Sequence, residues 1–276
     1  MILRNALRNA ATLPWEYGIS ALTARTVALR LEALRTVFLF IGCPRSGHSL
    51  LGFLLDAHPN VACAHELGML KYVRFGFDRN QIAGLILRNC RAAARRGPAS
   101  SGYAYDVPGQ WQGRTKDILA LGDKQGMGAA LRLGARPRLL ERLHAVMDPH
   151  AKFLHVVRNP FDSITTMSRR GTRPLRRTIP RYFRLCDITR RVAGRVAPAD
   201  WLEIRHEAFV ENPREGLAAI CRFLGIDPSP AYLEACAGIV FPGPRERRYD
   251  AQWPDPLIRE VTDRAAAFPF LEGYRF

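Results

Sequence analysis

The sequence predicts a three-layer α/β domain with a mostly parallel central sheet flanked by helices. Three observations predict it: short uninterrupted apolar runs, helix-length amphipathic segments between them, and turn-forming residues at the junctions. A run such as VFLFIG (37–42) is typical of a strand buried on both faces, and buried strands that alternate with helices form parallel sheets. The 276 residues, 47% of them hydrophobic, suffice for one large domain or two small ones.

The expected elements follow in chain order. Residues 1–35 have apolar positions at helical spacing among many arginines, so we expect a basic helical extension of one or two helices before a main domain at 36–276. Residues 97–115, rich in Gly, Pro, Ser and Tyr, indicate a long surface loop. Besides the first strand, strands are expected at VACA (61–64), DILALGD (117–123), KFLHVV (152–157) and WLEIRH (201–206). Helices are expected at 49–57, 80–96, 137–147, 160–170, 178–194 and 213–225.

The charge, hydropathy and cysteine content of the chain limit the kinds of protein that it can be. The net charge of +16 favours an anionic ligand, but the 37 arginines are spread along the chain, so we expect no nucleic-acid partner. No apolar run reaches membrane-spanning length and no secretory signal is recognisable, which predicts a cytoplasmic protein; contact with a membrane surface through 1–35 stays open. Six scattered cysteines without CxxC pairs argue against zinc and predict buried thiols in a reducing compartment.

The segment GCPRSGHS (42–49) carries the most specific pattern. It fits the phosphate-loop motif G-x-x-x-x-G-K-[ST] except that His48 replaces the lysine, whose loss disfavours a nucleoside triphosphate. The segment follows a strand and opens a helix, where N–H groups and the helix dipole favour an anion, and Arg45 can supply the displaced positive charge. Asp123, followed at once by Lys124, is no convincing magnesium ligand, so the loop indicates a metal-free phosphate site in a P-loop NTPase-like fold.

Four blocks together resemble a known family. PRSGHSLLGFLLDAHPNVACAHE (44–66), LGDKQG (121–126), HVVRNPFDSITTMSRR (155–170) and EIRHEAFVENPREGLAAICRFLGI (203–226) resemble, in the right order, segments of the sulfotransferases that use 3′-phosphoadenylyl sulfate (PAPS). The motifs are most similar to those of tyrosylprotein and related carbohydrate and bacterial members. The blocks span roughly two-thirds of the chain, which is more specific than one degenerate motif.

The resemblance implies a cofactor site. The loop would wrap the 5′-phosphosulfate of PAPS, while an arginine and a hydroxyl eight residues apart would hold the 3′-phosphate, with Ser163 as a competing hydroxyl. A basic turn in GPRERRYDAQW (243–253) loosely matches the C-terminal cofactor loop of the family. The residues so implied are Arg45, Ser46, Gly47, His48 and Ser49 for the loop, Arg158 and Thr166 for the 3′-phosphate, and Arg245, Arg247 and Arg248 for the C-terminal turn.

The resemblance also implies catalytic residues. Glu66 matches the general base of the tyrosylprotein-like members, and Lys124 matches a lysine that stabilises the bridging oxygen. Both lie at strand ends, where ligand crevices of α/β sheets form. His48 replaces the usual threonine of the loop and could bind the sulfate or compete with Glu66 and His65 for the base role. His206 stands where many members have tyrosine.

These features predict a sulfotransferase that moves a sulfuryl group from PAPS to a hydroxyl or amine and releases PAP without a metal. The alternatives are a P-loop kinase or NTPase-like phosphotransferase and a non-catalytic basic protein that binds nucleic acid or anionic surfaces. The acceptor, whether small molecule, carbohydrate, lipid or peptide, and the oligomeric state are left open. The acceptor pocket is expected in 70–115 and 170–195.

Overall fold

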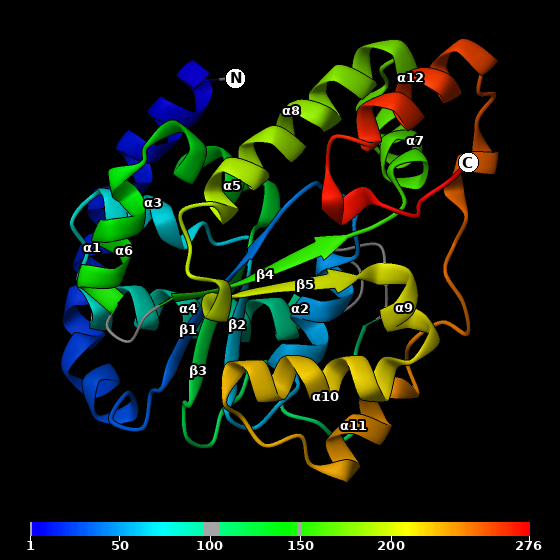
Figure 1. The fold of residues 1–276 in the computed structure, drawn as a ribbon. Helices are drawn as coiled ribbons and strands as arrows, with labels where there is room; N and C mark the ends of the chain where they lie inside the picture. The colour runs from blue at the N-terminus through cyan, green and yellow to red at the C-terminus, as the bar shows by residue number, and fades with distance from the viewer. Residues whose placement is uncertain (1, 97–104, 148–150) are drawn as a thin grey trace.

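The computed structural model describes residues 2–96, 105–147 and 151–276, which form three layers around a five-stranded sheet (Figure 1). The strand order is β2-β3-β1-β4-β5, and all four pairings are parallel. The predicted α/β fold with a mostly parallel sheet is therefore confirmed. The strands are β1 (Thr36–Ile41), β2 (Val61–His65), β3 (Ala120–Lys124), β4 (Ala151–Val157) and β5 (Trp201–Arg205).

The central strand β1 is completely buried and contributes side chains to the hydrophobic cores on both faces of the sheet. Its alternate residues Val37, Leu39 and Ile41 belong to the core on one face of the sheet, whereas Phe38 and Phe40 belong to the core on the other. This alternation follows from the two-residue period of a strand, and burial of both faces explains why the whole run is apolar. Because β1 lies between β3 and β4, the loop that follows it is flanked by the ends of both neighbours.

Helices cover both faces of the sheet. Figure 1 shows α10 and α11 below the strands, α8 and α12 above them, and α1 along the left side. The core that contains Phe38 and Phe40 is covered by α2 (His48–Asp56), α9 (His206–Glu211), α10 (Pro213–Leu224) and α11 (Pro230–Ala237). The opposite core packs against α1 (Ile2–Arg30), α3 (Met69–Arg74), α4 (Arg79–Arg96), α5 (Gly126–Ala135) and α6 (Arg138–Met147).

A third apolar cluster lies beside the carboxyl end of β4. It joins α7 (Pro160–Gly171), α8 (Leu175–Ala193) and α12 (Asp255–Ala265) through side chains such as Phe161, Phe183 and Phe268. Trp253 packs in this cluster and donates from Nε1 to Thr165 Oγ1 at 3.0 Å, which anchors the C-terminal segment to α7. The described residues also form the short 3₁₀ helices η2 (Pro198–Asp200), η3 (Arg247–Asp250) and η4 (Pro269–Leu271).

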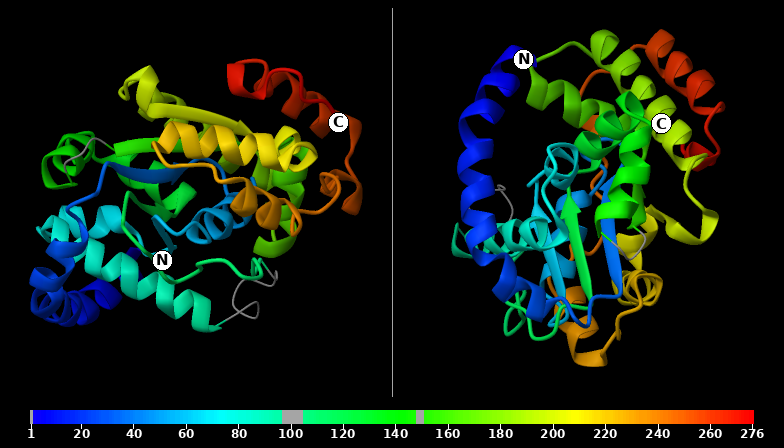
Figure 2. Two further views of the ribbon diagram at one scale, coloured as in Figure 1. Left: turned by 90° about the horizontal axis from the view of Figure 1, so that it is seen from below. Right: turned by 90° about the vertical axis from the view of Figure 1, so that its left-hand side faces the viewer.

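The N-terminal segment is a single helix through Pro14 that packs against α4 (Figure 2). Val27 is buried at this contact, and Gly84 of α4 leaves room for it. The apolar side chains of Trp15, Leu22 and Leu29 point away from the core and are exposed. Across the described ranges, no helix combines the length and apolar character needed to cross a bilayer. Contact between this segment and a membrane surface stays a prediction.

All the predicted strands and helices are found, but the helices α3, α5, α9, α11 and α12 were not predicted. All five strands and the helices at 49–57, 80–96, 137–147, 160–170, 178–194 and 213–225 are present within a few residues. Helix α5 was not predicted, because glycine is a poor helix former and Gly126, Gly128 and Gly134 all lie in it. Residues 97–104 of the predicted loop lie outside the described residues. The six cysteines are buried free thiols, as predicted.

Candidate functional site

The carboxyl ends of the five strands carry most of the residues that the sequence singled out. The loop 42–49 follows β1, Glu66 follows β2, Lys124 is the last residue of β3, Arg158 follows β4 and His206 follows β5. Since all strands are parallel, these ends meet at one edge of the sheet, and a cavity of about 890 Å³ opens there. Residues that are far apart in the sequence therefore meet at one site.

Ten of the predicted site residues line this cavity, whereas Ser46, Ser163 and Arg248 do not. Ser46 is buried and its hydroxyl donates to Cys43 O at 3.0 Å, so its side chain closes the loop on itself. Ser163 is fully buried and its Oγ has no hydrogen-bond partner among the described residues. Thr166 is the α7 hydroxyl residue that lines the cavity, and its hydroxyl donates to Asp162 O at 2.8 Å. The ten lining residues are Arg45, Gly47, His48, Ser49, Glu66, Lys124, Arg158, Thr166, Arg245 and Arg247.

The loop after β1 is built to leave N–H groups available. Gly47, the N-cap residue of α2, has a φ of 104° and provides no side-chain cap, so the first N–H groups of the helix need another acceptor. A Cβ atom at Gly47 would lie 2.4 Å from His206 Nδ1, which makes glycine necessary here. Arg45 also adopts a left-handed conformation, with a φ of 74°. An anion at this helix N-terminus would satisfy the exposed donors.

Arg158 ties the loop to the C-terminal segment. Its Nη1 donates to Arg45 O at 3.2 Å and its Nη2 donates to Arg245 O. Asp162, one turn into α7, lies 3.9 Å from Arg158 Nη2 and accepts from Arg248 N at 2.7 Å. Arg45 and Arg245, which are 113 and 87 positions from Arg158 in the sequence, therefore meet at the end of β4.

Lys124 lies between two other polar side chains of the site. Its Nζ is 3.2 Å from Glu66 Oε1 and donates to Ser49 Oγ at 3.3 Å. The side chain of Lys124 is 7% exposed, whereas that of Glu66 is 69% exposed. The ammonium group is therefore held in place by packing, while the carboxylate can be reached from the cavity. A proton acceptor and a fixed cation thus lie side by side beside the loop.

Asp123 holds the turn that carries Glu66. Its carboxylate accepts from the N–H groups of Leu67, Gly68 and Met69 at 3.1, 2.8 and 2.8 Å. Burial raises the pKa of the Asp123 carboxyl, and these three donors oppose that effect. Glu66 has a φ of 58°, a conformation that costs a non-glycine residue of order 1–3 kcal/mol and persists only where the surroundings enforce it.

His48 points into the protein from the first turn of α2. Its Nε2 lies 3.3 Å from Ile41 O, so this nitrogen carries the proton, and its ring packs edge-on against Phe40. Burial lowers the pKa of His48 to about 3. The ring lines the cavity close to Gly126, but its low basicity disfavours the base role that the sequence left open. His65 is 3.9 Å from Asp56 Oδ2 and lies outside the cavity lining.

His206 lies at the same site and has a buried ring nitrogen. It lines the cavity beside Gly47, and its Nδ1 is buried without a hydrogen-bond partner among the described residues. Burial, reinforced by the charge of Arg158, lowers the pKa of His206 to about 3. A neutral imidazole with an unpaired buried nitrogen is costly unless a ligand supplies the missing partner.

The cavity contains residues that the sequence did not indicate, chiefly from α5. Of the segments 70–115 and 170–195, in which the acceptor pocket was expected, Tyr105 and Arg170 line the cavity in the described part of the chain, and the place of the acceptor stays a prediction. The signal that could have found α5 is the helical spacing of its buried apolar residues Ala129, Ala130 and Leu133. Further lining residues that the sequence missed are Gln125, Met127, Gly128, Leu131, Ala135, Val210 and Phe241.

Positive charge strongly predominates in the cavity. Among the described residues, its lining includes eight arginine or lysine side chains and a single carboxylate, that of Glu66. In the ranges that the structure covers, no group of three His, Cys, Asp or Glu side chains is arranged to hold a metal ion. Such a surface binds ligands that carry several negative charges.

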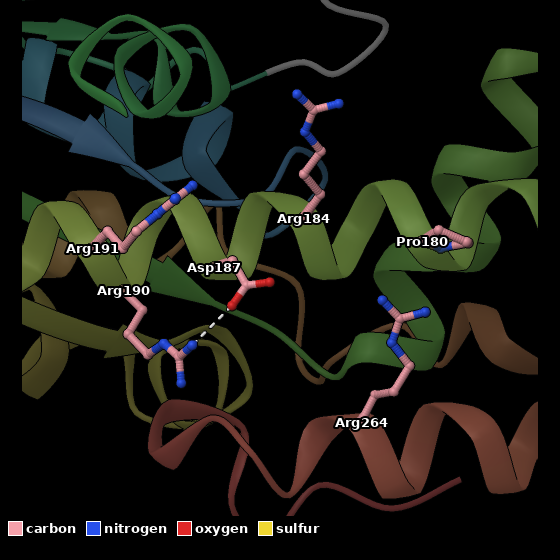
Figure 3. Close-up of a pocket in the computed structure, with 6 residues that line it drawn as sticks. All are labelled: Pro180, Arg184, Asp187, Arg190, Arg191 and Arg264. Carbon is pink, nitrogen blue, oxygen red and sulfur yellow. Dashed lines mark hydrogen bonds and ion pairs between the residues drawn. The ribbon is translucent and has the colours of Figure 1, made fainter. Parts of the chain in front are cut away.

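A second hollow lies on the far side of α8 and is shown in Figure 3. It is lined by Arg184, Arg190 and Arg191 of α8 with Arg264 of α12, and Asp187 pairs with Arg190 at 2.9 Å. Its volume is about 340 Å³, and none of the predicted site residues lines it. The cavity at the strand ends is therefore the candidate active site.

Comparisons with known proteins agree with this assignment. Residues 38–230 match the model of the sulfotransferase family. The fold is similar to that of the sulfotransferase domain from the Synechococcus PCC 7002 olefin synthase, with a TM-score of 0.53 and 18% identity over 85% of this chain and 94% of that one. It is also similar to the sulfotransferase domain from the curacin biosynthetic pathway, with a TM-score of 0.54 and 18% identity over 86% and 98%.

No curated protein matches the chain. The family match nevertheless covers well over half of its length and includes the loop, Glu66, Lys124 and Arg158. The chain belongs to the sulfotransferase family, and its activity is the transfer of a sulfuryl group.

Proposed function

We propose that the chain transfers the sulfuryl group of PAPS to a hydroxyl or amine of an acceptor bound in the cavity at the strand ends. The observation that carries this proposal is the contact of Lys124 with both Ser49 and Glu66. It joins the anion-binding loop, a fixed cation and an accessible carboxylate in one place. Sulfuryl transfer needs these three functions together.

The lining of the cavity fits the cofactor. PAPS carries a 3′-phosphate and a 5′-phosphosulfate, and the eight cationic side chains supply more than enough positive charge for both. A volume of about 890 Å³ is at the upper end of the range for ligand pockets, which leaves room for a nucleotide and an acceptor. His206, whose Nδ1 has no hydrogen-bond partner among the described residues, also lines this cavity.

Individual residues can be assigned to the two anionic groups. The loop N–H groups with Arg45 and Ser49 would hold the 5′-phosphosulfate, and Arg158 with Thr166 would hold the 3′-phosphate. Arg158 also fixes the backbone of Arg45 and Arg245 by its hydrogen bonds, so it acts on both ends of the nucleotide site. When bound, PAPS supplies the sulfuryl group and a phosphate leaving group.

The remaining residues perform the proton transfer and stabilise charge. Glu66 accepts the proton of the acceptor hydroxyl while the acceptor oxygen forms its bond to sulfur. As the bond between sulfur and the leaving phosphate oxygen breaks, Lys124 donates a hydrogen bond to that oxygen and stabilises its negative charge. The low exposure of Lys124 keeps its ammonium group preorganised, and the high exposure of Glu66 lets an acceptor approach it. His48, with its pKa lowered to about 3, contributes to the cavity wall rather than as base.

Calorimetric titration with PAP and with AMP tests the nucleotide assignment. PAP should bind more tightly, and Arg158→Ala should remove this preference at a cost on the order of 2–4 kcal/mol in PAP affinity. Arg184→Ala, which removes an arginine outside the cavity, serves as the matched control and should bind both ligands as the wild type does. Retention of the full preference for PAP by Arg158→Ala would refute the assignment.

Chelation separates the proposal from phosphoryl transfer. Because Arg45, Lys124 and the loop N–H groups supply the positive charge, turnover of PAPS should persist in EDTA. A reaction that EDTA abolishes and magnesium restores, with ATP as the donor, would support the phosphotransferase alternative instead.

A further inference from the structure

Helix α5 presents an apolar strip to the cavity. Met127, Leu131 and Ala135 are four residues apart, so they lie on one side of the helix, and all three line the cavity. Met127 and Leu131 are each 42% exposed, although both are large hydrophobic side chains. Ala129, Ala130 and Leu133 already bury the other side of the helix in the core. The exposed strip therefore has no packing role in the described protein and is available to a ligand.

Two arginines accompany this strip. Arg132, in the last turn of α5, and Arg136, the residue that follows the helix, line the same cavity. Arg132 Nη1 donates to Gln125 Oε1 at 2.5 Å, and Gln125 Nε2 donates to Glu66 O at 3.5 Å. Arg132 is therefore linked through Gln125 to the main-chain carbonyl of Glu66. No carboxylate within the described ranges forms an ion pair with either arginine, and burial lowers the pKa of Arg132.

These arginines are separate from those assigned to the nucleotide. Arg45, Arg158 and the C-terminal arginines belong to the loop after β1, the end of β4 and the segment pinned to α7. Helix α5 follows β3, which lies on the opposite side of β1 from β4 and next to the strand that leads to Glu66. Lys124 and Glu66 thus stand between two groups of cations, and the second group is not needed for the two phosphates of PAPS.

We infer that the acceptor is an amphipathic anion, a conclusion that rests on the proposed function. Its hydroxyl or amine lies at Glu66 and Lys124, an apolar segment lies along Met127, Leu131 and Ala135, and a carboxylate, phosphate or sulfate group pairs with Arg132 and Arg136. Neutral sugars lack the apolar segment, and simple neutral alcohols leave the two arginines without a counter-charge. The face formed by the apolar strip and the two arginines therefore selects an acidic alcohol or amine with an apolar portion.

Binding to the enzyme saturated with PAP isolates this face, because the nucleotide phosphates then occupy their own cations. The probes are octyl phosphate, octanol and inorganic phosphate, each titrated by calorimetry into the PAP complex. Octyl phosphate should bind about 10–100-fold more tightly than either single-feature probe, as expected for an added charge-assisted hydrogen-bond pair. Equal binding of octanol and octyl phosphate would overturn the inference.

Variants locate the site and separate its failure from that of the proposed function. Arg136→Met and Arg132→Met should each reduce the advantage of octyl phosphate over octanol, and Leu131→Asp should abolish it, while PAP affinity stays within a few-fold of wild type. Arg138→Met, an exposed arginine of α6 outside the cavity, is the matched control. Unchanged octyl phosphate binding in all three variants would overturn the inference alone. Failure of the wild type to bind PAP would overturn the proposed function and the inference together.

Discussion

Replacement of Glu66 should separate catalysis from stability. Glu66 is held at a φ of 58°, and a left-handed conformation costs a non-glycine residue about 1–2 kcal/mol. Glu66→Gly removes this strain but adds conformational freedom to the unfolded chain, worth roughly 0.5–1 kcal/mol. The ion pair with Lys124 contributes no more than about 1 kcal/mol, because the Glu66 side chain is 69% exposed. These effects nearly cancel.

The expected outcome is a stable protein without activity. The free energy of unfolding of Glu66→Gly should lie within about 1 kcal/mol of wild type, measured by urea denaturation. Its kcat should fall by roughly 10²–10⁴-fold, the usual effect of losing a positioned general base. Glu66→Gln keeps the size of the side chain and an oxygen that can accept from Lys124, so it should lose kcat similarly while PAP affinity hardly changes.

Two results would refute this reasoning. A kcat for Glu66→Gln within a few-fold of wild type would show that Glu66 is not the base. A loss of more than about 2 kcal/mol of stability in Glu66→Gly would show that the strained conformation is not the dominant backbone effect.

Three further predictions concern the surroundings of the site. Gly47→Ala should weaken PAP binding at least tenfold and lower the melting temperature, because its Cβ would lie 2.4 Å from His206 Nδ1. Burial holds the pKa values of His48 and His206 near 3, so unfolding takes up protons below about pH 6.5. The free energy of unfolding should then fall with decreasing pH by up to about 1.4 kcal/mol per unit for each histidine, and urea titrations of His206→Asn between pH 7 and pH 5 should show a shallower slope. Asp123→Asn should lower kcat and cost about 1–3 kcal/mol of stability, since an amide cannot accept all three N–H groups; Asp117→Asn is the exposed control.

The sequence predicted the sheet well because its strands are buried on both faces. In an α/β chain, a run such as VFLFIG is interpreted as a buried parallel strand. The residue after each such strand then lies at the carboxyl edge of the sheet, where ligand sites form. Glu66 and Lys124 could be placed at strand ends from the sequence. Their contact could not, because it depends on the register that sets His65 beside Lys124 in the β2–β3 pairing.

The parts that the sequence missed depend on tertiary contacts. Helix α5 forms despite three glycines because Leu133 and two alanines are buried against the sheet and Gly134 fits against Ile188. Thr166 reaches the cavity and Ser163 does not because of the way α7 packs, which a spacing rule does not contain. The placement of the segment that carries Arg245 and Arg247 depends on two long-range hydrogen bonds: Arg158 donates to Arg245 O, and Asp162 accepts from Arg248 N.

The most direct test of the central claim is sulfuryl transfer from PAPS by the wild type and by Lys124→Met. The acceptors are a panel of phenols, sugars, lipid alcohols and peptides, with products identified by mass spectrometry. Lys124→Met keeps an unbranched side chain but removes the charge that is proposed to stabilise the leaving oxygen. We expect PAPS-dependent sulfated product from the wild type and a rate at least 100-fold lower from Lys124→Met, with PAP affinity within about tenfold. Equal rates for the two proteins would contradict the account.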